Sequence, residues 1–213
     1  MDSIRFPPLP REFLENPIIL ILCSQLMGTI GSMLMIGDKA MQLLVFLVVS
    51  TVIAILSWPW LRNPRAHGFY RFFAFETVLL LILLNSTAWF QHPFALLQVF
   101  SWILLLGSLI LAIHGFYLLR VIGKPRGKIE DTTRLVTQGA YCYIRHPLYA
   151  SLLLFGAGAL LKEVSWTSLA LFIALAAFLI AAARIEEAEN LQHFGSEYTE
   201  YMKKTKMFIP NVL

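Results

Sequence analysis

Residues 147–184 read PLYASLLLFGAGALLKEVSWTSLALFIALAAFLIAAAR. Before the closing arginine, only Lys162 and Glu163 interrupt this run with charge. A helix crosses the hydrocarbon core of a bilayer with about 20 apolar residues. Residues 164–184 reach that length, whereas residues 147–161 would extend only ~22 Å at about 1.5 Å per residue. The stretch therefore predicts two apolar helices joined by a tight turn, a helical hairpin.

The composition of the whole chain points the same way. Of 213 residues, 58% are hydrophobic and 14% are charged, whereas soluble domains have roughly 45–50% apolar and about 25% charged residues. We therefore expect an all-α integral membrane protein. The net charge of +4 fits basic cytoplasmic loops, and we expect no nucleic-acid partner. The two cysteines, Cys23 and Cys142, show no metal-ligand spacing, and we expect no metal.

Four further apolar stretches precede the hairpin, at residues 17–36, 41–60, 70–90 and 94–119. They predict about six transmembrane helices, with five as the alternative, in a single membrane domain covering residues 1–213. Residues 1–119 would supply the first four helices. Residues 120–213 carry nearly all the unusual polar chemistry, and we expect them to form the catalytic portion.

The distribution of positive charge predicts the orientation. With six helices, nearly all Lys and Arg residues fall on one side, and Lys39 and Lys162 fall on the other. Positive residues collect on the cytoplasmic side. Both termini should therefore be cytoplasmic, in a cell inner membrane or the endoplasmic reticulum. The oligomeric state is left open.

Two polar clusters stand at the cytoplasmic ends of the predicted hairpin. The first is LVTQGAYCYIRHPLY, residues 135–149. Gly139 permits a tight turn, and Pro147 is suited to the first position of a helix. Arg145 and His146 would then lie at a helix N-terminus, whose free N–H groups favour an anion. Tyr141, Tyr143 and Tyr149 add aromatic faces that could hold a cation or a purine. The alternative is an interfacial anchor of headgroup-level side chains.

The second cluster is RIEEAENLQHFGSEYTEY, residues 184–201. It predicts that the last membrane helix continues into the cytoplasm, with a further helix beyond it. Arg184 and Glu187 share one helical face, and Glu186 shares another with Glu189. Glu189 fits a solvated, salt-bridged helix extension. Two polar residues of the membrane helices stay open: Glu76 is either functional or paired with Arg71 or another loop arginine, and His114 either packs or lines a pocket.

Together, the clusters offer anion-binding groups, carboxylates and aromatic faces on one surface. S-adenosylmethionine carries a carboxylate, a ribose, an aromatic base and a cationic centre, and so matches these groups. A nucleotide cofactor matches less well, because no glycine-rich phosphate-binding loop is present.

Residues from about 120 to 210 resemble the isoprenylcysteine carboxyl methyltransferase family and, more distantly, the membrane phospholipid N-methyltransferases. The resemblance rests on both clusters and on the short hairpin between them. It implies an integral membrane methyltransferase that uses S-adenosylmethionine and acts on a lipophilic acceptor within membrane lipid. Thr133 stands where the prenylcysteine enzymes commonly have histidine, so the acceptor stays open among a prenylated cysteine, a lipid amine and a thiol.

The resemblance also implies roles for individual residues. Arg184 and Glu187 would be catalytic, and Arg184 would orient an anionic group of the substrate. The cofactor would be bound by Gly139, Tyr141, Arg145, His146, Pro147, Tyr149, Glu186 and Glu187.

Two other functions stay open at this point. One is a membrane sterol-type reductase that uses NADPH and has a related hairpin. The other is a non-enzymatic membrane scaffold.

Overall fold

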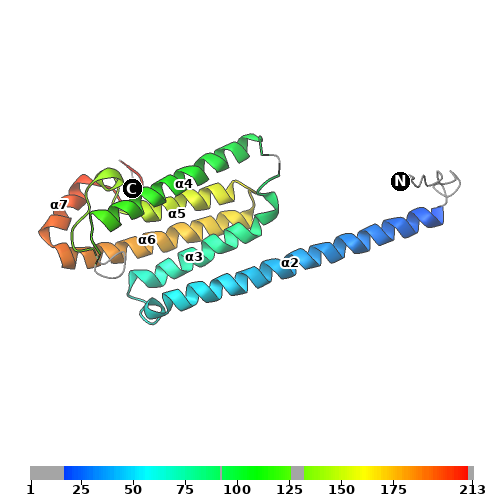
Figure 1. Ribbon diagram of the computed structural model, residues 1–213, viewed down its shortest axis with the longest axis horizontal. Coiled ribbons are helices and arrows are strands. Elements are labelled where there is room, and N and C mark those ends of the chain that lie inside the picture. Colours follow the sequence, from blue (N-terminus) through cyan, green and yellow to red (C-terminus); the bar gives the residue numbers. More distant parts are fainter. Residues whose placement is uncertain (1–16, 92, 126–131, 211–213) are drawn as a thin grey trace, which may run out of the picture. The chain divides into compact units, whose positions relative to one another are not determined.

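The computed structural model describes residues 17–91, 93–125 and 132–210, with side chains from residue 38 onward. Within these ranges the secondary structure is helical, and the one β-type pairing is an isolated bridge between Ile144 and Lys206. Figure 1 shows this all-helical chain. The chain divides into two compact units, Met1–Leu47 and Val48–Leu213. The functional residues discussed below all belong to the second unit.

Helix α2 covers Pro17–Leu61, a run of 45 residues. The sequence predicted two helices, at 17–36 and 41–60, with a break between them. This prediction is wrong, because the helix is continuous. The intervening residues 37–40 read GDKA, and a single glycine costs a helix only about 1 kcal/mol. Without a proline there, the helix continues. The prediction that the N-terminus is cytoplasmic concerns residues 1–16, which lie outside the described ranges.

The remaining α-helices overlap the predicted ones, whereas the short helices η1 and η2 were not predicted. They are α3 (His67–Leu84), η1 (Ser86–Ala88), α4 (Leu96–Val121), η2 (Gly139–Cys142), α5 (Pro147–Leu160), α6 (Trp166–Phe194) and α7 (Ser196–Lys204). Four helices of the described residues are long and apolar enough to cross a membrane: Asp38–Leu61 within α2, and α3, α4 and α6. Helix α5 has 14 residues and is shorter than a bilayer span. The protein is an integral membrane protein, as its composition predicts.

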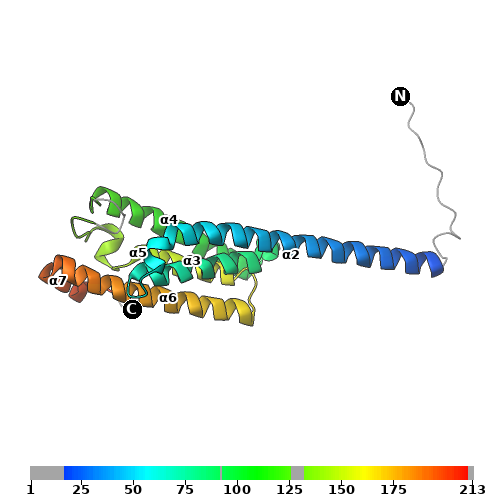
Figure 2. The same ribbon diagram turned by 90° about the horizontal axis from the view of Figure 1, so that it is seen from below.

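Helices α3, α4, α5 and α6 lie side by side (Figure 1). Helix α5 packs mainly against α4, and α6 packs mainly against α3. The buried core runs between them and includes Leu81, Leu175 and Leu179. Figure 2 shows α7 at one end of this bundle, and the connection between α5 and α6 lies at the other end. The polar clusters of the sequence therefore gather at the α7 end.

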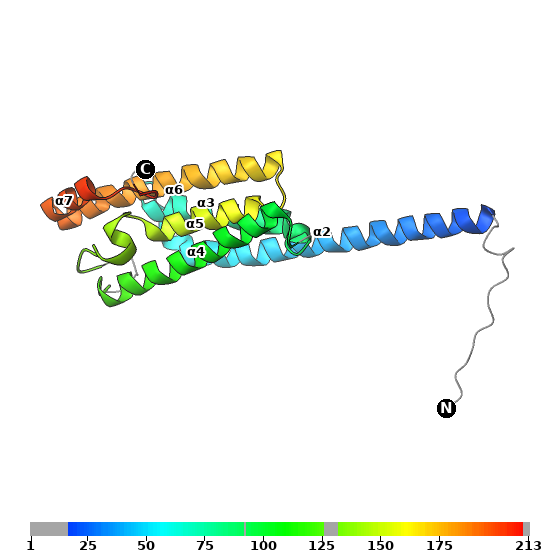
Figure 3. The ribbon, with the colours of Figure 1, turned by 90° about the horizontal axis from the view of Figure 1, so that it is seen from above.

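The short helix α5 is fixed at its C-terminal end by side chains from its neighbours. Ser101 donates to the carbonyl of Gly158 at 2.7 Å, and Asn85 donates to the carbonyl of Ala159 at 2.8 Å. The last carbonyls of a helix have no partner inside it, and few groups can replace water within a membrane. These donors therefore let α5 end inside the bundle, as seen from above in Figure 3.

Candidate functional site

The loop before α5 has the local structure that its glycine and proline predict. Helix α5 begins at Pro147, with His146 as the preceding N-cap residue. Gly139 has φ of +58°, and a β-carbon there would lie 2.5 Å from Nε2 of His114 on α4. Residues with a side chain avoid that backbone region. Gly139 and Pro147 thus shape the loop, and His114 packs beneath it.

A segment following α7 pairs with this loop. The backbone N–H groups of Arg145 and His146 donate to the carbonyls of Lys206 and Met207, at 2.7 and 3.1 Å. Phe208 is 3% exposed, and its ring centroid lies 6.1 Å from that of His146. Sequence reasoning missed this pairing, although the apolar residues after Lys206 gave a signal for it. The chain beyond α7 therefore holds Arg145 and His146 in place.

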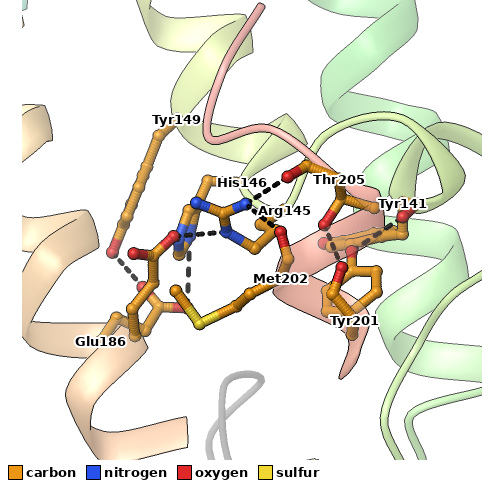
Figure 4. A network of polar contacts seen from close by, with 9 residues as sticks. Tyr141, Arg145, His146, Tyr149, Glu186, Tyr201, Met202 and Thr205 are labelled. Carbon is orange, nitrogen blue, oxygen red and sulfur yellow. Dashed lines mark hydrogen bonds and ion pairs between the residues drawn. The ribbon is translucent and has the colours of Figure 1, made fainter. Parts of the chain in front are cut away.

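Arg145 is tied to the protein on two sides. Its Nε donates to Oε1 of Glu187 at 2.5 Å, and its Nη1 donates to the carbonyl of Thr205. The Arg145 and Glu187 side chains are 10% and 9% exposed. Figure 4 shows the guanidinium between α6 and the segment after α7. Arg145 thus joins three segments that are distant in the sequence.

His146, Tyr149 and Glu186 form the polar wall of the site (Figure 4). The Tyr149 hydroxyl donates to Oε2 of Glu186 at 2.6 Å. The His146 and Tyr149 rings stack, with centroids 5.4 Å apart and planes 12° from parallel. Nε2 of His146 lies 3.4 Å from Oε1 of Glu187, yet it is buried without a hydrogen bond to the described residues. This nitrogen therefore faces the Glu187 carboxylate inside the protein.

Three buried tyrosines link α7 to the loop. The Tyr201 hydroxyl donates to the carbonyl of Tyr141 at 2.8 Å. Burial raises the pKa of Tyr141, Tyr198 and Tyr201 above the usual phenol value, and nearby Glu186 adds to the effect at Tyr141. The three phenols therefore stay neutral at physiological pH, and the Tyr201 hydroxyl acts as a hydrogen-bond donor.

These groups border one pocket with about 680 Å³ of empty space, part of it open to solvent. The pocket is lined by Arg71, Leu119, Thr132, Leu135, Val136, Tyr141, Arg145, His146, Leu148, Tyr149, Glu186, Asn190, Phe194, Tyr198 and Tyr201. One wall is polar and the other is apolar, which suits a ligand with both characters.

The structure brings most, but not all, of the predicted site residues together. Those that line the pocket are Tyr141, Arg145, His146, Tyr149 and Glu186. Glu187 is held against Arg145 and His146 but does not itself line the pocket. Gly139 and Pro147 shape the loop without lining the pocket. Arg184 is exposed and lies outside the lining.

Other pocket residues were not assigned to the site from the sequence. Asn190 and Phe194 follow Glu186 at intervals of four residues, which places all three on one face of α6. That spacing was a readable signal. Arg71 comes from α3, which is distant in the sequence, so no local pattern could connect it with the other residues.

Comparison with known proteins points to the part of the chain that contains this pocket. Residues 96–197 match the family model described as phospholipid methyltransferase. This segment is similar to the phospholipid methyltransferase family and makes up just under half of the chain. It runs from the start of α4 to the start of α7 and contains most of the pocket residues.

Two relatives named protein-S-isoprenylcysteine O-methyltransferase confirm the resemblance predicted from the sequence. The one from Schizosaccharomyces pombe is 35% identical over 77 residues, which cover 36% of this chain and 33% of the relative. The one from Saccharomyces cerevisiae is 34% identical over 84 residues, which cover 39% of this chain and 35% of the relative. The chain thus matches about a third of the length of these curated relatives.

Proposed function

We propose that this protein is an S-adenosylmethionine-dependent methyltransferase of the membrane that acts on a lipophilic acceptor. The observation that supports this most directly is the pocket in which His146, Tyr149 and Glu186 converge within the methyltransferase-family segment. Two relatives with methyltransferase names align with part of the chain. A bound cofactor would supply an electrophilic methyl group, and the acceptor would attack it.

The pocket residues fit the parts of this cofactor. The His146 side chain lines the pocket, and its Nε2 lies 3.4 Å from Oε1 of Glu187, which fixes the orientation of the ring. The Glu186 carboxylate, oriented by Tyr149, offers an acceptor for ribose hydroxyls or an ammonium group. The stacked His146 and Tyr149 rings provide a flat surface beside the sulfonium or the base. Glu187 and Arg145 neutralise each other and hold these side chains in place.

The apolar wall fits the acceptor. Leu119, Leu148 and Phe194 line the pocket at the ends of membrane helices α4, α5 and α6. A lipophilic acceptor can reach such a wall from the bilayer. Exclusion of water there would favour methyl transfer to an anion, because opposite charges neutralise as the transition state forms. Holding donor and acceptor in line supplies a further part of the acceleration.

We infer that the pocket end of the bundle faces the cytoplasm. Helix α7 and the C-terminal end of α4 lie at that end, and they carry or adjoin Lys203, Arg120 and Lys124, whereas Lys162 follows the C-terminal end of α5, at the other end of the bundle. Positive residues favour the cytoplasmic side. Because α2 is one helix, we favour the five-span arrangement, with α5 and α6 as the hairpin. The cofactor would then enter from the cytoplasm.

Methyl transfer by the purified full chain in detergent tests the function. Radiolabelled S-adenosylmethionine is supplied with a membrane lipid extract or with model prenylcysteines. Wild type should produce a labelled lipid, and calorimetry should show cofactor binding. His146→Ala should weaken both the labelling of lipid and the binding of cofactor. Arg184→Ala tests the predicted catalytic role of Arg184, whose side chain is exposed. A protein that binds NADPH instead, or labels no acceptor, contradicts the proposal.

A further inference from the structure

The turn between α2 and α3 lies at the surface of the membrane. The membrane-spanning part of α2 ends at Leu61, and that of α3 begins at His67. A turn as short as residues 62–66 stays close to the ends of both spans, at the level of the lipid headgroups. His67 pairs with Glu189 on α6 at 2.5 Å. The turn therefore belongs to the end of the bundle that carries the pocket.

The backbone of this turn is fixed by its own hydrogen bonds. The N–H of Asn63 donates to the carbonyl of Trp60, and the N–H of Ala66 donates to the carbonyl of Asn63, both at 3.0 Å. The N–H of Arg65 donates to Oδ1 of Asn63 at 3.1 Å. The short side chain of asparagine commonly closes turns in this way. Arg65 thus extends from a backbone of fixed shape.

Arg62 stacks on an exposed tryptophan. Its central carbon lies 5.2 Å from the centroid of the Trp58 ring, and Trp58 is 56% exposed. Tryptophan is enriched where a membrane protein crosses the headgroup level. Stacking occupies the face of the guanidinium, whereas its five N–H donors lie in its plane. The pair thus places a hydrogen-bonding cation beside an apolar ring at the membrane surface.

The protein does not neutralise the two arginines of this turn. Arg62 and Arg65 are exposed, and neither forms an ion pair with a carboxylate within the described ranges. Several carboxylates at this end already have basic partners, namely Glu187 with Arg145, Glu189 with His67 and Glu200 with Lys203. The turn itself, RNPRA, contains no acidic residue. Its positive charge is therefore left for an anion from outside the chain.

We propose that Arg62 and Arg65 bind the phosphate of an anionic phospholipid, while Trp58 contacts the glycerol and the upper part of the acyl chains. Guanidinium groups bind phosphate oxygens with paired hydrogen bonds. The partner is a lipid and not a soluble phosphate, because the turn lies at headgroup depth and a soluble anion would make no use of the exposed ring. This lipid is not the methyl acceptor, since none of the three side chains is among the described residues that line the pocket.

Lipid binding to the purified full chain tests the inference. The protein in neutral detergent is mixed with dioleoyl phosphatidylglycerol or dioleoyl phosphatidylcholine, and native mass spectrometry measures the bound lipid. The two lipids have the same acyl chains, so a difference in affinity reports the charge of the headgroup. Wild type should bind the anionic lipid at least about tenfold more tightly, since each arginine near the headgroups contributes about fivefold.

Substitutions in the turn should change this preference in a defined way. Arg62→Gln and Arg65→Gln should each reduce it by about fivefold, and the double variant should remove it. Arg62→Lys should keep most of it, because the charge remains. Trp58→Leu should weaken both lipids to a similar extent. If the double variant does not fold, the two single variants carry the test.

Arg120→Gln is the matched control. Arg120 is exposed in the last turn of membrane helix α4, so its substitution removes the same charge at a similar depth. It should leave the preference for the anionic lipid intact. An equal loss in Arg120→Gln would show a general effect of surface charge and would overturn the assignment to the turn.

Two further outcomes would also overturn the inference. One is equal affinity of wild type for the two lipids. The other is displacement of the lipid by an equal concentration of glycerol 1-phosphate, which would identify a site for soluble anions. The lipid is measured without cofactor or acceptor, so a protein that transfers no methyl group would contradict the proposed function and leave this result standing.

Discussion

Arg145 and Glu187 form a buried ion pair that joins the loop before α5 to helix α6. The Nε–Oε1 distance is 2.5 Å, and the two side chains are 10% and 9% exposed. Glu187 also approaches His146, with Oε1 at 3.4 Å from Nε2. The same carboxylate thus contacts both adjacent loop residues and fixes the polar wall of the pocket relative to α6.

Removing one partner of this pair should destabilise the protein. We expect Arg145→Met or Glu187→Leu alone to lower the free energy of unfolding by about 3–5 kcal/mol, because a buried charge is left unpaired. The double variant should lose less than the sum of the two. Denaturant unfolding in detergent measures these values. The exposed pair of Lys203 and Glu200 is the control, and Glu200→Gln should change stability by less than about 1 kcal/mol. Equal effects at the two pairs would contradict this account.

The hydrogen bond from Tyr149 to Glu186 should matter for ligand binding. Tyr149→Phe keeps the ring that stacks on His146 and removes the 2.6 Å hydrogen bond. Losing a bond to a carboxylate costs roughly 1.5–3 kcal/mol, so we expect cofactor affinity to fall by about tenfold or more. Calorimetry measures it. Tyr143 is 67% exposed, and Tyr143→Phe should leave affinity unchanged. Unchanged binding in Tyr149→Phe would show that the orientation of Glu186 is unimportant.

Gly139 should tolerate substitution poorly. Gly139→Ala combines a positive φ with a contact of 2.5 Å to Nε2 of His114. Gly195 also has φ of +58°, but a β-carbon there would have no neighbouring atom within 4 Å. We expect Gly139→Ala to be more destabilising than Gly195→Ala, which should cost about 1–3 kcal/mol for its backbone alone. Gly107→Ala, in open space inside α4, should be neutral or stabilising. Thermal unfolding of the three variants gives this ranking, and a reversed order would be inconsistent with the packing of Gly139 on α4.

The buried tyrosines should make the protein sensitive to alkali. Burial raises the pKa of Tyr141, Tyr198 and Tyr201 in the folded state. The unfolded chain therefore loses phenolic protons first, once pH exceeds about 10. Stability should be fully present below that pH and should fall above it, by up to about 1.4 kcal/mol per pH unit for each group. Unfolding at pH 9 to 11 measures the slope. Tyr201→Phe should make the slope shallower, and an unchanged slope would exclude Tyr201 as a contributor.

Much of the fold could be predicted because it depends on local patterns. Apolar runs indicated α3, α4 and α6, and the RHP sequence placed the start of α5 at Pro147, as observed. The prediction failed at residues 37–40, where length alone suggested two helices and no residue ended the first. Asn85 and Ser101, which bind the C-terminal carbonyls of α5, could not be assigned because their partners lie far along the sequence.

The sequence by itself determined that this is a helical membrane protein, and it predicted that two polar clusters carry the chemistry. Composition, helix length and the position of proline depend only on nearby residues. The tertiary structure alone decided which side chains of each cluster meet. Glu187 turned to Arg145 and Glu186 to Tyr149, while Arg184 stayed exposed and Arg71 of α3 reached the pocket. Packing of α3 against α6 brings Arg71 close to Glu186, and the distance between these two residues in the sequence hides that contact.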